Sequence, residues 1–163
     1  GPLLDTSGKM IGINTMILSS SGSSAGVGFA VSSETAMRVV SDLLKYGKVK
    51  RGVIDASLYQ LDYRIARYAG LDITQGMLVS EVTDGGNAEK VGIKGGTEAA
   101  YYGNRKNIIY LGGDVITQID NIKIASLADY YSALENKRPG DTVKVVVRRN
   151  KQDLVFNVKL SGE

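Results

Sequence analysis

The 163-residue sequence contains no cysteine and no histidine. Without cysteine the chain has no disulfide, no thiol nucleophile and no thiolate metal site. Without histidine it cannot supply the imidazole that accepts the serine proton in a Ser-His-Asp triad, nor the usual histidine-containing zinc site. We therefore predict no catalytic residues, no metal and no cofactor for this chain, and we expect it to be catalytically inert by the triad mechanism.

Long apolar runs are also missing. No stretch approaches the roughly 20 apolar residues that a membrane-spanning helix needs, so the chain is not expected to span a membrane. The formal net charge is +3, but the basic residues are scattered, with short clusters at 48–51 and 148–151. Because they form no continuous stripe with interleaved aromatics, we predict no nucleic-acid partner. The second cluster indicates a charged hairpin turn.

The first 47 residues are typical of a few strands followed by one helix. Apolar residues at 3–18 and 26–31 predict short strands. Ser32 begins a helix with an apolar face, and Gly47 ends it. Two or three strands alone are marginal in water, so we expect this segment to be the end of a larger barrel. In isolation it should expose apolar strands that pair between molecules or swap domains.

After a linker at 48–52, residues 53–163 are typical of a mixed domain of strands and helices. The expected strands are 53–58, 76–82, 114–120, 142–148 and 154–160. The expected helices are 62–70, 87–91 and 127–136. The last two strands alternate apolar and polar residues and form a closing hairpin. Residues 95–112 are expected to be a long irregular insertion.

Three blocks, in this order, resemble the HtrA/Deg family of trypsin-like serine proteases. They are Gly1-Pro2-Leu3-Leu4-Asp5 with Gly8 to Thr15; Gly26 to Val31 with the exit Tyr46 to Gly52; and Gly92-Ile93, Gly113-Asp114-Val115-Ile116, Pro139-Gly140-Asp141 and Arg148-Arg149. Each block alone is common, since a glycine in a strand or before a turn has structural uses in any fold. The ordered combination covers nearly the whole chain.

The resemblance implies an α+β fold. Residues 1–47 would be the C-terminal remnant of a trypsin-like β-barrel, and 53–163 a permuted PDZ domain, a partly open β-barrel with two helices. Gly1 would be the last glycine of the family motif Gly-Asn-Ser-Gly-Gly-Pro, which places the nucleophile upstream. Ile13, Asn14 and Thr15 would belong to the strand that pairs with the substrate of the protease. An ordinary place in the barrel core is an equal alternative for these three residues.

For the PDZ domain, the resemblance implies that a partner peptide is bound by strand addition. The loop Val53, Ile54, Asp55 and Ala56 would hold the terminal carboxylate through the amides of the last three residues. An apolar pocket would lie between this loop and the predicted helix. Its side chains would be Ile54, Ala56, Leu58, Leu127, Tyr131 and Leu134. A purely structural place in the core remains the alternative for each of them.

Asp55 departs from the glycine that the family usually has at this position. A β-carbon restricts the loop backbone, and a carboxylate beside an anion site repels it. Two outcomes are compatible with this departure: the groove binds internal or extended segments, or the Asp55 side chain points outward. We expect weak binding of hydrophobic C-terminal peptides.

The sequence suggests three alternative functions. The first is a regulatory peptide-binding module of a protease in the cell envelope, with unfolded or C-terminal peptide segments as partners and a homo-oligomer as the full protein. The second, an active peptidase, is disfavoured by the missing histidine. The third is a non-enzymatic scaffold that also uses the insertion at 97–111, where tyrosine, arginine and apolar residues suit protein contacts. A surface flap packed on its own domain is the alternative for this insertion.

Overall fold

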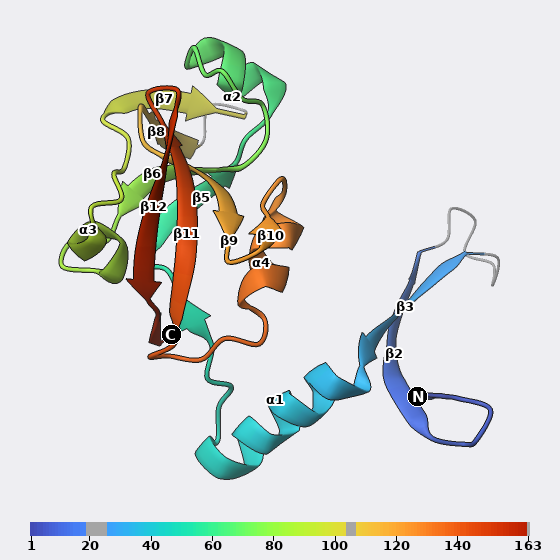
Figure 1. Ribbon diagram of the computed structural model, residues 1–163. Helices are drawn as coiled ribbons and strands as arrows, with labels where there is room; N and C mark the ends of the chain where they lie inside the picture. Colours follow the sequence, from blue (N-terminus) through green and yellow to red (C-terminus); the bar gives the residue numbers. More distant parts are fainter. Residues whose placement is uncertain (19–25, 104–106, 163) are drawn as a thin grey trace. The chain divides into compact units, whose positions relative to one another are not determined.

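A computed structural model describes residues 1–18, 26–103 and 107–162 (Figure 1). The chain divides into two units, Gly1–Val49 and Lys50–Glu163. This division falls within the residues predicted as a linker. Helices and antiparallel sheets occur in both units, which confirms the α+β class. No sheet in the described ranges closes into a barrel.

The first unit is a three-stranded antiparallel sheet followed by one helix. Asp5 closes the first turn, because its carboxylate accepts from the backbone N–H groups of Ser7 and Lys9 at 2.8 and 2.9 Å. The strands and helix predicted for this segment are confirmed. They are β1 (Pro2–Leu4), β2 (Met10–Leu18), β3 (Val27–Ser32) and α1 (Ser33–Tyr46), with the strands in the order β1-β2-β3.

Both predicted ends of α1 are confirmed by its caps. The Ser32 side chain accepts from the Thr35 N–H at 3.2 Å, which satisfies one of the free amides of the first turn. Gly47 adopts φ 70°, and its N–H donates to the Leu43 carbonyl at 2.9 Å. A residue with a β-carbon is strained in this left-handed conformation, so glycine suits the helix end.

The second unit is built on one large sheet with the order β12-β11-β9-β6-β5, and β10 pairs with β9. Two small two-stranded sheets, β4–β13 and β7–β8, accompany it. The strands are β4 (Gly52–Val53), β5 (Ala56–Gln60), β6 (Met77–Val82), β7 (Glu98–Tyr102), β8 (Asn107–Leu111), β9 (Val115–Ile119), β10 (Ile122–Lys123), β11 (Thr142–Arg149), β12 (Gln152–Lys159) and β13 (Ser161–Gly162). The helices are α2 (Tyr63–Tyr68), α3 (Asn87–Val91) and α4 (Leu127–Leu134).

The predicted closing hairpin is confirmed as β11 and β12. Val143, Val145 and Val147 are fully buried, as the alternation of apolar residues predicted. The chain turns at Asn150 and Lys151, which have φ angles of 49° and 64°. Two successive positive φ angles are typical of the hairpin turns that match strand twist. The basic cluster at 148–151 is therefore a hairpin turn, as expected.

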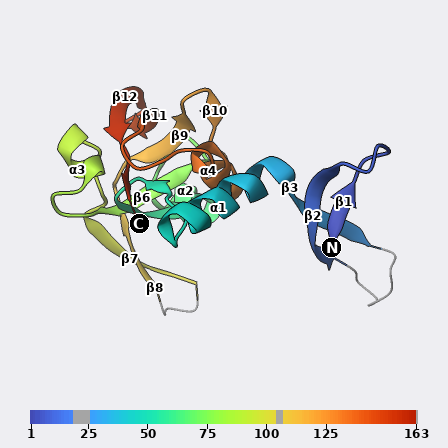
Figure 2. The same cartoon turned by 90° about the horizontal axis from the view of Figure 1, so that it is seen from below.

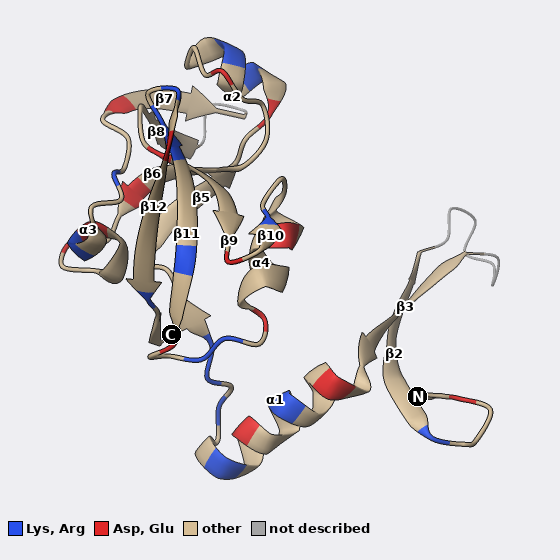
Figure 3. Cartoon of the chain, viewed as in Figure 1, with Lys and Arg blue, Asp and Glu red and all other residues tan. Residues whose placement is uncertain are grey.

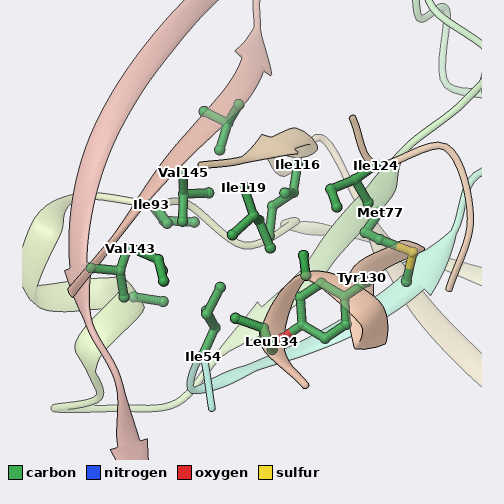
Figure 4. Close-up of a cluster of buried hydrophobic side chains, with 14 of the residues drawn as sticks. Ile54, Met77, Ile93, Ile116, Ile119, Ile124, Tyr130, Leu134, Val143 and Val145 are labelled. Carbon is green, nitrogen blue, oxygen red and sulfur yellow. The ribbon is translucent and has the colours of Figure 1, made fainter. Parts of the chain in front are cut away.

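The core of the second unit lies between the large sheet and helices α3 and α4. Figure 4 shows Ile54, Tyr130 and Leu134 meeting side chains of the sheet such as Ile119 and Val143. A smaller cluster packs α2 and the β7–β8 hairpin on the sheet. The core therefore fixes α4 against the segment that begins at Ile54.

Lysines and arginines are spread among acidic residues over many elements (Figure 3).

Two expectations from the sequence are wrong. Residues 95–112 are not irregular, because they contain the antiparallel hairpin β7–β8, which Figure 2 shows extending from the unit. The expected strand 53–58 is broken at Ile54 and Asp55, between β4 and β5. The backbone just after β8 packs closely on β6. A β-carbon on Gly113 would lie 2.1 Å from the Val79 carbonyl oxygen, so only glycine fits there.

Candidate peptide-binding groove

Strand β5 is the open edge of the large sheet, and helix α4 packs beside it. β5 pairs with β6 on one side, and no strand in the described ranges pairs with its other side. The two elements are tied together where Gln60 accepts from the backbone N–H of Leu127 at 2.9 Å. A strand edge with unpaired backbone groups is a template for another extended segment. The arrangement can therefore accept a peptide along β5.

Four of the predicted pocket residues form the inner side of this region. Ile54 and Leu134 are only 4% and 7% exposed and belong to the main core cluster. Ala56 and Leu58 are half-buried on β5 and pack against the same cluster. The structure thus brings these four side chains together, with the two on β5 nearer to solvent.

The other two predicted pocket residues, Leu127 and Tyr131, are 39% and 63% exposed on α4. The adjacent Tyr130 takes the buried position, at 8% exposure, and its ring meets that of Tyr131 edge-on at 5.7 Å between centroids. Sequence reasoning chose Tyr131 by helical spacing and missed Tyr130. Leu127 and Tyr131 are available to a ligand because they are not used by the core.

Tyr130 is joined to the predicted carboxylate-binding loop. Burial raises the pKa of Tyr130 to about 12, with further contributions from Tyr131 and the charge of Asp55. A hydrogen bond from the Ile54 backbone acts in the opposite direction and lowers this pKa. Tyr130 and Ile54 also belong to the same buried core cluster, so the tyrosine lies next to the first residue of this loop.

The Asp55 side chain is directed toward α3 and β13. Its carboxylate accepts from the Asn87 N–H at 2.9 Å and from the Ser161 hydroxyl at 2.5 Å. The Asn87 side chain also makes hydrogen bonds to the loop backbone. Its Oδ1 accepts from the Asp55 N–H at 2.8 Å, and its Nδ2 donates to the Val53 carbonyl at 2.8 Å. The loop is thus closed by a polar network whose members are far apart in the sequence. Sequence reasoning missed Asn87 and Ser161.

The strand predicted to serve the protease substrate lies in the first unit. Ile13 and Asn14 sit on β2, where they pair with Val31 and Ala30 of β3, and the Asn14 N–H donates to the Gly1 carbonyl at 2.9 Å. Thr15 lies in a bulge and donates its hydroxyl proton to a β3 carbonyl. All three residues are exposed. Their role in substrate pairing stays a prediction.

Acidic side chains in the described part of the chain do not gather into a group of three that could share a metal ion. Among the helices of residues 1–18, 26–103 and 107–162, none combines the length and the hydropathy needed to cross a membrane.

Comparison with known proteins assigns the chain to a family. The sequence profile described as "PDZ domain" matches residues 26–160. The chain is 33% identical over 160 residues to the periplasmic pH-dependent serine endoprotease DegQ of Escherichia coli, a match that covers 98% of the chain and 31% of the relative. It is 35% identical over 166 residues to the chloroplastic protease Do-like 1 of Arabidopsis thaliana, with 98% and 34% covered. The chain spans about a third of these relatives.

Solved structures agree with the sequence matches. The HtrA-type protease AlgW with decapeptide superposes with a TM-score of 0.66 at 31% identity, covering all of the chain and 45% of that protein. The chain therefore belongs to the PDZ domain family. Its homologues over nearly the whole length are the DegQ, DegP-like and HtrA-type serine proteases, which confirms the family resemblance of its sequence.

Proposed function

We propose that the chain is the peptide-binding regulatory and substrate-recognition module of an HtrA-like serine endopeptidase. The observation that carries the proposal is the unpaired edge of β5 beside α4, with half-buried apolar side chains on the strand and exposed ones on the helix. In this arrangement the backbone of a bound segment pairs with β5 and its side chains enter the apolar region along α4. The chain supplies no histidine for bond cleavage.

The full protein is proposed to act in the cell envelope, on unfolded or C-terminal segments of other proteins, and as a homo-oligomer. Several relatives are described as periplasmic serine endoproteases, which supports the location and the reaction. One structural neighbour was solved with a decapeptide, which supports the peptide as ligand.

Titration of a fluorescent, N-acetylated decapeptide of alternating valine and threonine tests the proposal. Anisotropy is expected to show saturable binding. The same decapeptide with N-methyl groups on alternate amides is expected to bind at least about tenfold more weakly, because it cannot form the strand hydrogen bonds on that edge. Two N-methylated versions, one for each edge of the peptide, ensure that the pairing edge is covered. Equal affinity for all three peptides would contradict strand addition.

Tyr131 provides a test of the helix side of the groove. Tyr131→Ala is expected to weaken peptide binding about fivefold, since it removes an aromatic contact surface without opening the core. Tyr63→Ala on α2 is the matched control, because Tyr63 is 65% exposed and Tyr131 is 63% exposed. The proposal is wrong about this surface if both variants bind like the unmodified chain.

A second candidate function is a scaffold that binds protein partners through the β7–β8 hairpin. A cavity of about 640 Å³ lies between this hairpin and α2, and its lining includes Tyr68 and Tyr101, which are 72% and 71% exposed. Exposed aromatic residues around a hollow suit a protein contact. Tyr101→Ala would then disrupt assembly of the full protein in size-exclusion chromatography while peptide binding at β5 is unchanged.

A further inference from the structure

A specificity rule follows from the loop that closes the end of the groove, and it rests on the proposed function. We propose that the groove selects extended internal segments of polypeptides, or segments whose C-terminus is neutral, and that Asp55, Asn87 and Ser161 together exclude a terminal carboxylate.

Amides of the loop already have acceptors of their own. A peptide carboxylate at the end of a strand-addition groove needs N–H groups with no other acceptor. In this loop the Asp55 N–H donates to Asn87 Oδ1 at 2.8 Å and the Ala56 N–H donates to the Ile54 carbonyl at 2.9 Å. A carboxylate would have to displace these acceptors one by one.

Several hydrogen bonds from other elements hold this loop closed. Asn87 Nδ2 donates to the Val53 carbonyl at 2.8 Å and to the Lys159 carbonyl at 3.0 Å. Ser161 pairs with Val53 in the β13–β4 sheet, and its hydroxyl donates to the Asp55 carboxylate at 2.5 Å. The loop is therefore attached to α3 and β13, and Asn87 in turn ties α3 to β12. Turning its amides toward the groove would break several of these bonds.

Close packing behind the loop restricts Asp55. Gly86 has no β-carbon, and one placed there would lie 2.7 Å from the Asp55 Cβ. The start of α3 thus approaches the Asp55 side chain closely and leaves it little room to rotate. The Asp55 backbone also accepts from the Thr83 N–H at 3.0 Å. The side chain and the backbone of this residue are both fixed in the closed arrangement.

The charge of Asp55 also disfavours a terminal carboxylate. Its own carboxylate lies in the loop whose amides would have to hold the terminus. A second carboxylate at the same place is repelled. The peptide bond of an internal segment carries no net charge and is not repelled. The chain therefore favours a continuing backbone over a free terminus.

The experiment compares one labelled decapeptide in three forms: free acid, C-terminal amide, and extended by Ser-Gly-Ser-amide. The unmodified 163-residue chain is expected to bind the amide and the extended form at least as tightly as the acid. Asp55→Gly removes the charge and the β-carbon, and it is expected to improve acid binding relative to amide binding about tenfold. Asp84→Gly is the matched control for the change of charge, since Asp84 is exposed.

Asp55→Asn separates the two causes, because it removes the charge but keeps a side chain that can hydrogen-bond to Asn87. It is expected to give a smaller gain for the acid than Asp55→Gly. An unmodified chain that binds the acid about tenfold more tightly than the amide would overturn the inference while leaving the proposed function intact. Failure of all three peptide forms to bind any version of the chain would instead overturn the proposed function.

Discussion

Arg149 and Asp114 form an ion pair at the junction of α3, β9 and β11. Nε and Nη2 of Arg149 donate to the two carboxylate oxygens at 2.6 and 2.7 Å, and Nη2 also donates to the Gly92 carbonyl at 2.7 Å. Asp114 is 1% exposed and accepts from the Lys94 N–H at 2.9 Å. Hydrogen bonding to Asp114 raises the pKa of Arg149. These contacts join α3, β9 and β11 around one buried carboxylate.

We expect Arg149→Met to lower the free energy of unfolding by about 3 kcal/mol, because it leaves the Asp114 carboxylate buried without its charged partner. Urea unfolding followed by circular dichroism measures the loss. Arg148→Met is the matched control, since the partners of Arg148, Asp72 and Asp153, are far more exposed than Asp114. The loss for Arg148→Met should be clearly smaller. Equal losses for the two variants would contradict the conclusion that the burial of Asp114 makes its pairing with Arg149 important for stability.

The Tyr130 hydroxyl makes the free energy of unfolding depend on pH in the alkaline range. Its pKa is raised from 10.0 to about 12 in the folded chain, chiefly by burial. The stabilisation is complete below pH 10 and is lost as the pH rises toward 12, because the unfolded chain releases the proton first. The loss amounts to about 3 kcal/mol at about 1.4 kcal/mol per pKa unit. Tyr130→Phe should show a shallower decrease over this range in urea unfolding, and parallel pH profiles would refute the prediction.

Among the elements, α4 has the best-defined beginning. The Ser126 side chain accepts from the Asp129 N–H at 3.2 Å, and the Asp129 carboxylate accepts from the Ser126 N–H at 2.9 Å. The hydrogen bond from the Ser126 side chain and those from the backbone lower the pKa of Asp129. This reciprocal cap fixes the end of α4 that meets Gln60 of β5, and so it positions one wall of the groove.

Ser126→Ala is expected to lower the free energy of unfolding by about 1 kcal/mol and to weaken peptide binding, because the first turn of α4 loses its cap. Thermal and urea unfolding measure the first effect, and anisotropy measures the second. Ser132→Ala, at an exposed position of the same helix, serves as the control. A Ser126 variant as stable as the Ser132 variant would show that the cap does not hold the groove.

Elements with strong local signals were predictable from the sequence. The alternation of valines in β11 and the capping residues Ser32 and Ser126 depend on neighbours in the chain. The hairpin β7–β8 was missed, although two runs rich in tyrosine and isoleucine flank a short segment that contains Gly103. The break at Asp55 was missed because Val53 and Ile54 favour a continuous strand. There the polar network to α3 and β13 overrides local preference.

At the scale of the whole chain, the first unit carries much exposed apolar surface. Its described residues include only one buried apolar side chain, Ala36. Large apolar side chains that are more than half exposed occur on both its sheet and its helix. They are Leu4, Met16, Ile17, Leu18, Val27, Met37 and Leu44. This agrees with the expectation that the segment exposes apolar strands, and surfaces of this kind are covered in stable proteins.

We therefore expect the chain to self-associate in a concentration-dependent manner. Sedimentation velocity over a range of micromolar concentrations measures the oligomer. Residues 50–163 alone are the control, since both core clusters lie within this unit and it should remain monomeric. A full chain that stays monomeric at all concentrations, with residues 1–49 protected in hydrogen exchange, would contradict the expectation.

The site was predictable only in outline. The resemblance to the HtrA family placed a groove between the segment from Val53 and the helix from Leu127, and the structure brings these segments together. The partners of Asp55 could not be predicted, because Asn87 and Ser161 lie 32 and 106 positions away in the sequence. Such contacts are fixed by the packing of three elements, which no local pattern encodes.

Amide chemical-shift mapping of the 163-residue chain during titration with the valine–threonine decapeptide tests the central claim most directly. If an extended segment adds to the open edge of β5, the largest shifts will occur at Ala56–Gln60 and at Leu127–Leu134. The β12 edge at the other end of the sheet should be unaffected. Saturable shifts that avoid both β5 and α4 would contradict the claim.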